Sequence, residues 1–292
     1  MKRTQRFSKR IPHRAAIVLV EVLLCGLARS QEAAPQKGHF TIYGFIVYRD
    51  VTSPASASSG VLASVQRYGI QPVDLVYEQR LLDVDEASPR DAKINLDKID
   101  AIAKDALKNP GELVALDMED WNRFDTAHSP ALYLQVLKEF QRANPKSKVG
   151  LYGIVPQVTY GWSDDVPVKY DKLNASYKQV AEAVSYFSPS LYNWERALTD
   201  ESWERAAKYA IDSAHAYDAS KPVIPYITPE VTRNGNTSFL SYDQMLFRLQ
   251  TLKRLGVDGC IIWTGTASGR KAGGTFDPSQ GWAKAVVDFR KE

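Results

Sequence analysis

Short apolar runs alternate along the chain with longer stretches whose apolar residues recur every three or four positions. Runs typical of buried strands cover residues 41–48, 73–77, 113–117, 149–154, 184–191, 223–227 and 259–263. Stretches with helical periodicity cover residues 96–107, 132–143, 176–183, 202–217 and 242–255. Asp97 and Asp100 fall in the first turn of one predicted helix, and Gly256 directly follows another. The pattern therefore predicts alternating strands and helices.

Strands that alternate with amphipathic helices are typical of βαβ units around a parallel sheet. Seven or eight such units within about 250 residues predict an α/β fold, specifically a distorted TIM-like (β/α) barrel in a single domain. A doubly wound open sheet is the alternative. The sequence has neither a G-x-G-x-x-G segment after an early strand nor a phosphate-binding loop. This disfavours an open sheet that binds nucleotides.

The first thirty residues have the pattern of a secretory signal peptide. A basic stretch precedes an apolar run over residues 15–28, and Ala28 and Ser30 supply small residues for a cleavage site. We therefore expect residues 1–30 to be a signal peptide, residues 31–38 a short polar leader and residues 39–292 the barrel domain. Such a protein would be secreted or periplasmic. Because Glu21 interrupts the apolar run, an uncleaved N-terminal anchor is the alternative.

Loss of residues 1–30 would reverse the sign of the net charge. The 292-residue chain has a formal net charge of +3, but residues 1–30 hold seven basic residues and one acidic residue, so the remainder carries −3. This charge gives no indication of a nucleic-acid partner, nor of a membrane partner beyond the possible anchor. Only Cys260 would remain as a cysteine, and its apolar surroundings predict a buried side chain.

Carboxylates and aromatic residues gather where the predicted strands end. In a parallel barrel these ends meet at one rim, and that rim carries the active site. Paired carboxylates cleave glycosidic bonds, and aromatic rings can line a cleft that holds a sugar. The composition therefore indicates a glycoside hydrolase, with a polysaccharide or oligosaccharide as partner. The candidate site residues are Asp117, Glu119, Trp121, Arg123, Tyr152, Tyr192, Asn193, Tyr226 and Trp263.

Asp117 and Glu119 are the candidate catalytic pair. Side chains at i and i+2 of a strand point to the same face, so both carboxylates and Trp121 would project together. Two carboxylates held close cannot both ionise freely, and the retained proton suits a general acid. In the alternative interpretation Asp117 caps the following helix or pairs with Arg123, while Glu119 is solvated.

Residues for other chemistries are sparse in the sequence. It has four histidines, no H-x-x-x-H segment and no Cys/His cluster, which disfavours a zinc site. No loop has the alternating oxygen ligands of a calcium site, and no G-x-S-x-G segment is present. We therefore expect neither a metal nor a cofactor.

Several strand-end segments resemble the hyaluronidases, glycoside hydrolases of family 56 that cleave hyaluronan and chondroitin. Residues 117–121 read Asp-Met-Glu-Asp-Trp, where that family has Asp-Trp-Glu-x-Trp. Residues 189–192 match its Pro-Ser-x-Tyr segment, and residues 222–226 match Pro-Val-x-Pro-Tyr. Phe239 and Leu240 then precede a helix and the Gly-x-x-x-Trp segment at residues 259–263. The order and spacing of these segments carry the resemblance, from residue 43 to residue 263.

The resemblance implies a distorted barrel and a retaining, substrate-assisted mechanism. Glu119 would protonate the leaving oxygen and later activate water, while Asp117 would orient and polarise an N-acetyl group of the substrate. The acetamide oxygen would attack the anomeric carbon, so that no protein nucleophile is required. Tyr192 would hydrogen-bond the acetamide, and Trp263 would form a wall beside its methyl group.

Several departures from the hyaluronidase pattern bear on the substrate. The structural disulfides of that family are absent, and Met118 replaces the tryptophan between the carboxylates. Asn122 stands where a basic residue is expected, and Arg123 follows it. Hyaluronan itself is therefore left open as the substrate. A second tyrosine of the family has no clear counterpart, although Tyr226 or Thr228 could substitute for it.

Three alternatives remain open from the sequence. A double-displacement glycosidase would use Glu230 or Glu195, both at predicted strand ends, as its nucleophile. A non-catalytic carbohydrate-binding barrel would keep the aromatic cleft without turnover. A barrel enzyme of unrelated chemistry would share only the fold.

Overall fold

The computed structural model describes residues 40–52, 64–85, 87–109, 112–158, 162–193 and 199–291. The predicted signal peptide over residues 1–30 and the leader over residues 31–38 lie outside these ranges and stay predictions. The described residues all belong to one compact unit, Lys37–Glu292. Within that unit none of the described helices has the length and apolarity needed to cross a bilayer.

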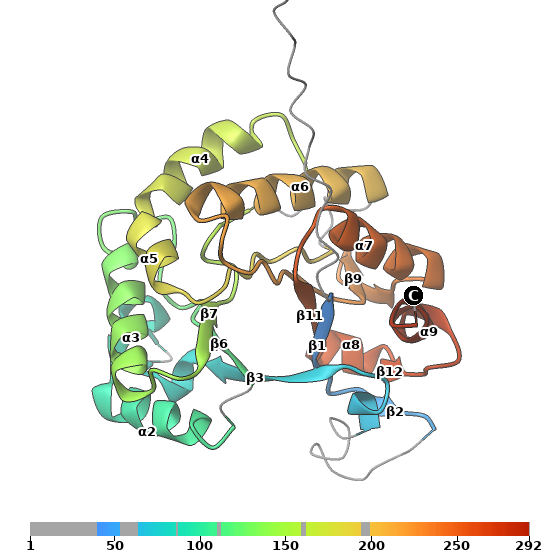
Figure 1. The fold of residues 1–292 in the computed structure, drawn as a ribbon, viewed down its shortest axis with the longest axis horizontal. Helices are drawn as coiled ribbons and strands as arrows, with labels where there is room; N and C mark the ends of the chain where they lie inside the picture. The colour runs from blue at the N-terminus through green and yellow to red at the C-terminus, as the bar shows by residue number, and fades with distance from the viewer. Residues whose placement is uncertain are drawn as a thin grey trace, which may run out of the picture. The chain divides into compact units, whose positions relative to one another are not determined.

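A curved parallel sheet of six strands forms the centre of the fold (Figure 1). Its order is β7-β6-β3-β1-β11-β8, and every neighbouring pair is parallel. Crossovers between parallel strands need long connections, which the intervening helices supply. The strands are β1 (Thr41–Phe45), β3 (Gln71–Tyr77), β6 (Leu113–Asp117), β7 (Lys148–Leu151), β8 (Tyr226–Ile227) and β11 (Gly259–Trp263).

The extended segment 184–193 joins the two edges of this sheet and closes the ring. It makes isolated parallel bridges rather than a continuous ladder, partly because Pro189 within the segment has no N–H to donate. The predicted distorted (β/α) barrel is thus confirmed, with this segment in the place of the predicted strand 184–191. Hydrogen bonds at its two sides include Ser185 N–H to Val149 O (2.7 Å), Gly153 N–H to Ser188 O (3.0 Å), Ile224 N–H to Phe187 O (2.8 Å) and Tyr226 N–H to Pro189 O (2.9 Å).

Helices flank the outside of the strands (Figure 1). Those that match predicted stretches are α2 (Leu96–Ala106), α3 (Ser129–Ala143), α5 (Lys178–Ala183), α6 (Asp200–Tyr217) and α7 (Tyr242–Arg254). A capping box at Ser241 and Gln244 starts α7, and Gly256 follows its end at φ +78°, as predicted. In the described part of the chain, helices also form outside the predicted stretches, at α4 (Val166–Ser176), α8 (Ala267–Lys271) and α9 (Gly281–Phe289).

Short two-stranded sheets accompany the central sheet. The hairpin of β9 (Glu230–Arg233) and β10 (Asn236–Phe239) turns at Asn234 and Gly235, both with positive φ, as an Asn-Gly hairpin turn requires. Two single-turn 3₁₀ helices, η1 (Glu78–Arg80) and η2 (Pro89–Asp91), lie between the β3 end and α2. The pairs are β2 (Arg49–Asp50) with β12 (Thr275–Phe276), β4 (Leu82–Asp83) with β5 (Lys93–Ile94), and β9 (Glu230–Arg233) with β10 (Asn236–Phe239).

Tyrosine rings belong to the buried cluster that the barrel strands enclose. Tyr186 is fully buried, and its hydroxyl donates to Val114 O at 3.0 Å. Its ring lies against Gly150, where a Cβ atom, if present, would come within 2.5 Å of the ring. Tyr152, Tyr192 and Tyr226 belong to the same cluster and lie nearer the C-terminal ends of the strands. The barrel is therefore a packed core with its aromatic residues continuing up to the rim.

Candidate active site

The end of β6 places two carboxylates at the C-terminal rim of the barrel. Asp117 is the last residue of β6, is 8% exposed and pairs in register with Tyr77 of β3. Its Oδ1 is buried without a hydrogen-bond partner. Glu119 follows two residues later and is exposed to solvent. The pair therefore consists of one carboxyl group beneath the rim and one at its surface.

The environment favours protonation of both carboxyl groups. Burial raises the pKa of Asp117 to about 8, and the negative charges of Glu119 and Glu78 add to this effect. Desolvation of the Glu119 carboxyl group by the surrounding protein also raises its pKa. Arg123 opposes that rise, and the charge of Asp120 adds to it. The structure thus brings Asp117 and Glu119 close enough to repel, and near neutral pH Asp117 holds a proton.

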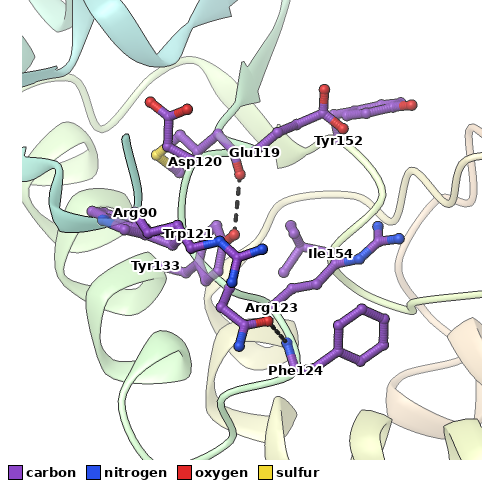
Figure 2. Close-up of a pocket in the computed structure, with 11 residues that line it drawn as sticks. Arg90, Glu119, Asp120, Trp121, Arg123, Phe124, Tyr133, Tyr152 and Ile154 are labelled. Carbon is purple, nitrogen blue, oxygen red and sulfur yellow. Dashed lines mark hydrogen bonds between the residues drawn. The ribbon is translucent and has the colours of Figure 1, made fainter. Parts of the chain in front are cut away.

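A pocket of about 280 Å³ opens beside Glu119. Figure 2 shows that the side chains of Glu119 and Asp120 leave the chain in opposite directions. Phe124, 49% exposed, lies at the pocket beneath the Arg123 guanidinium, whose carbon is 5.4 Å from the ring centroid. The pocket therefore combines a candidate acid with cations and a ring. The residues lining it are Arg90, Met118, Glu119, Asp120, Trp121, Asn122, Arg123, Phe124, Tyr133, Tyr152 and Ile154.

Aromatic rings from four strand ends form a continuous row across the barrel mouth. Tyr192 stacks on Trp263, with ring centroids 5.6 Å apart and planes at 23°. It also lies 5.6 Å from Tyr152, whose hydroxyl is 3.0 Å from Ser190 Oγ. The Trp263 indole N–H donates to the Tyr77 hydroxyl at 3.3 Å. These contacts hold flat apolar faces next to the carboxylate pair.

Tyr226 lies under this row, close to Asp117. It is 1% exposed, and its ring contacts Tyr152 edge to face at 4.9 Å. Its hydroxyl is buried without a hydrogen-bond partner. Burial raises its pKa well above the usual value, and the charge of Asp117 contributes. The Tyr226 hydroxyl and Asp117 Oδ1 are thus two buried polar atoms without hydrogen-bond partners at the floor of the site.

Trp121 and Asn193 are buried side chains in the walls of two pockets. The Trp121 indole N–H donates to Ala92 O at 2.9 Å, which fixes its ring at 4% exposure. The Asn193 amide donates to Thr228 O at 2.6 Å and accepts from Arg248 Nε at 2.9 Å. These bonds engage both ends of the Asn193 side chain. Direct contact of Trp121 or Asn193 with a substrate stays a prediction.

Glu230 lines a second, small pocket together with Trp263 and Tyr192. It is 4% exposed, and its carboxylate accepts hydrogen bonds from the hydroxyls of Tyr48 and Thr266. This fixes Glu230 within the barrel wall. The other proposed nucleophile, Glu195, lies outside the described residues. In the described part of the chain, no group of three or more His, Cys, Asp or Glu side chains could hold a metal ion.

Residues that were not candidate site residues also join the site, among them Tyr77, Glu78, Arg90 and Phe124. Tyr77 and Glu78 end the second predicted strand, so their position was a usable signal. Arg90 lies in η2, and no strand or helix periodicity marks that segment. Phe124 follows the carboxylate motif in a loop. Only the folded chain brings Arg90 and Phe124 to the same pocket.

Comparisons with known proteins relate the fold to other barrels. No model of a known protein family matches this chain, and no curated protein matches it. Bee venom hyaluronidase in complex with a hyaluronic acid tetramer matches with a TM-score of 0.57 and 16% identity, over 87% of this chain and 95% of that chain. The two chains share a barrel fold. A glucosidase from Croceicoccus marinus matches with a TM-score of 0.50 and 12% identity, over 83% of this chain and 53% of that chain.

Proposed function

We propose that this protein is a retaining glycoside hydrolase that cleaves an N-acetylhexosamine-containing polysaccharide by substrate-assisted catalysis. The observation that carries the proposal is the Asp117–Glu119 pair at the β6 end, next to the ring row of Tyr152, Tyr192 and Trp263. Two carboxyl groups with raised pKa values beside stacked rings suit protonation of a glycosidic oxygen within a bound sugar chain.

Glu119 acts first as acid and then as base in this proposal. Its proton passes to the leaving oxygen while the acetamide oxygen of the same sugar bonds to the anomeric carbon, and the glycosidic bond breaks. The Glu119 carboxylate then takes a proton from water as the water oxygen displaces the acetamide oxygen. Two inversions leave the anomeric configuration retained.

Asp117, Tyr192 and Trp263 form the acetamide environment in this proposal. Asp117 orients and polarises the acetamide, Tyr192 hydrogen-bonds it, and Trp263 packs beside its methyl group. The stacking of Tyr192 on Trp263 supports a fixed pocket for a flat group. The Glu230 carboxylate is hydrogen-bonded to Tyr48 and Thr266 within the barrel wall. Double displacement with Glu230 as the nucleophile is therefore the less favoured mechanism.

Two guanidinium groups favour an acidic polymer, such as a hyaluronan- or chondroitin-like chain. Arg90 and Arg123 both line the pocket beside Glu119. Guanidinium groups pair with carboxylates in a bidentate geometry, so they suit a uronic acid. We further propose that the protein is exported through its N-terminal segment, which cell fractionation and N-terminal sequencing of the mature chain would test.

The decisive experiment measures reducing ends released from hyaluronan, chondroitin, chitin and peptidoglycan glycan by residues 31–292. We expect Glu119→Gln to lose on the order of thousands-fold in kcat, because it cannot supply a proton to the leaving oxygen. Glu112→Gln is the matched control, since it removes one carboxylate just before β6, at the opposite end of the same strand. Equal rates for Glu119→Gln and the wild type would exclude Glu119 as the acid.

A thiazoline analogue of N-acetylglucosamine tests the substrate-assisted step separately. Competitive inhibition by the thiazoline is the expected result, because the compound mimics the cyclised acetamide. Hydrolysis without such inhibition, together with inactivity of Glu230→Gln, would favour double displacement. Sugar binding without turnover of any of the four polymers would favour the non-catalytic barrel.

A further inference from the structure

Glu78 lies beside the candidate pair on the neighbouring strand. It directly follows β3, and the parallel register of β3 and β6 sets Tyr77 opposite Asp117. Glu78 is therefore one step beyond the Asp117 level, next to the segment that carries Glu119. It is the first residue of η1, so the chain turns away after it and leaves its side chain at the rim.

Both carboxylate oxygens of Glu78 are engaged. The backbone N–H of Glu119 donates to Glu78 Oε2 at 2.7 Å, and the Gln79 side-chain amide donates to Oε1 at 3.0 Å. Glu119 stands two residues past the end of β6, beyond the last β3–β6 pair. A carboxylate acceptor makes a stronger hydrogen bond than a neutral one. Glu78 thus fixes the backbone from which the Glu119 side chain starts.

The charges around Glu78 are predominantly negative. Asp117, Glu119 and Asp120 face it from the β6 end. The charges of Glu78, Asp117 and Glu119 also act on the Tyr77 hydroxyl. Burial raises the pKa of Glu78, while the Glu119 N–H lowers it. In turn, the negative charge of Glu78 raises the pKa of Asp117.

Cations near Glu78 are directed elsewhere. Lys98 of α2 reaches the Gln79 carbonyl oxygen at 3.3 Å, but it pairs with Asp83 at 3.0 Å. Arg123 acts on the charge of Glu119. The field of Glu78 at the candidate pair is therefore not neutralised by a direct ion pair among the described residues.

We propose that Glu78 is a positioning residue for the reaction: it holds the Glu119 backbone amide and places a negative charge beside the Asp117–Glu119 pair. The inference rests on the proposed function for its kinetic consequences, but the hydrogen bond itself does not. Its two actions can be separated, because Gln keeps an acceptor oxygen and loses the charge, whereas Ala loses both.

The kinetic test compares pH profiles of kcat/KM for the wild type, Glu78→Gln and Glu78→Ala. Loss of the charge makes the pair easier to deprotonate, so the alkaline limb moves to lower pH by about one unit in both variants. We expect kcat at the optimum to change little in Glu78→Gln and to fall about tenfold in Glu78→Ala, with KM unchanged. Glu112→Gln should leave the profile unchanged. Alkaline limbs that superimpose on the wild type would overturn the proposal.

An NMR measurement keeps this test independent of activity. A hydrogen bond to a carboxylate deshields an amide proton, so the Glu119 amide resonance should move upfield strongly in Glu78→Ala and less in Glu78→Gln. An unmoved resonance in a folded Glu78→Ala would refute the positioning role. An inactive wild type, or a fully active Glu119→Gln, would instead refute the proposed function and leave the amide result standing.

Discussion

At the scale of single residues, the site is built at the expense of stability. Asp117 is buried among tyrosine rings with one oxygen unpaired and with two other carboxylates near it. In an unfolded chain its carboxyl group would ionise near its ordinary pKa of 3.8. The folded state therefore holds a proton that the unfolded state releases, and such groups cluster where chemistry is done.

The sign of this linkage gives a prediction for Asp117→Asn. Because the pKa is raised to about 8 on folding, the stability associated with the neutral form is fully present below pH 4 and is lost as the pH rises through 8. Asn cannot ionise, so the variant should gain relative to the wild type with rising pH, by a few kcal/mol on an order-of-magnitude scale at pH 8. Urea unfolding at pH 4.5 and 8 measures this. A difference independent of pH would contradict the raised pKa.

At the scale of elements, a close side-chain fit inside the barrel joins β7 to the segment that closes the ring. Gly150 of β7 faces the Tyr186 ring, and the Tyr186 hydroxyl bonds to Val114 of β6. A side chain at position 150 would have to displace a fully buried ring whose hydroxyl is hydrogen-bonded. The glycine therefore lets a large ring cross the inside of the barrel.

Gly150→Ala should destabilise the protein by about 1–3 kcal/mol through overpacking against Tyr186. Thermal and urea unfolding would measure the loss. Tyr186→Leu removes the clashing ring atoms, so Gly150→Ala should cost less in that background, and a double-mutant cycle would report the coupling. Additive effects of the two substitutions would show that Gly150 and Tyr186 do not contend for the same space.

Elements with strong periodicity could be predicted from the sequence, whereas those set by tertiary contacts could not. The run ending at Asp117 is entirely apolar before that residue, and its structure matches the predicted strand at both ends. By contrast, α4 contains Pro167 and has weak amphipathicity, so the sequence predicted only α5, the helix that follows α4 in the chain. The site follows the same rule: Asp117 and Glu119 share one motif, but Arg90 reaches the pocket beside Glu119 only through the fold.

At the scale of the whole molecule, Cys260 is a probe of global unfolding. It lies at 0% exposure in β11, between β1 and β8, and burial raises the pKa of its thiol. A thiol in the middle of the sheet is reached only when the sheet opens.

In residues 31–292, where Cys260 is the only cysteine, a disulfide reagent should therefore label the native protein slowly and the urea-unfolded protein at once. Labelling rates at increasing urea should track the free energy of unfolding, and reductant should leave the melting temperature unchanged. Rapid labelling of the native protein would mean that β11 opens locally.

We expect the ring of strands to open first at the closing segment 184–193. It is held by isolated bridges, whereas β3 and β6 share five register pairs. Amide exchange should accordingly begin at this seam and reach β6 last. Since Tyr192 lies in the closing segment and stacks on Trp263, opening of this segment would also move the row of rings at the barrel mouth. A bound sugar that clamps these two rings together would act as a latch, and the fold would be most rigid while occupied.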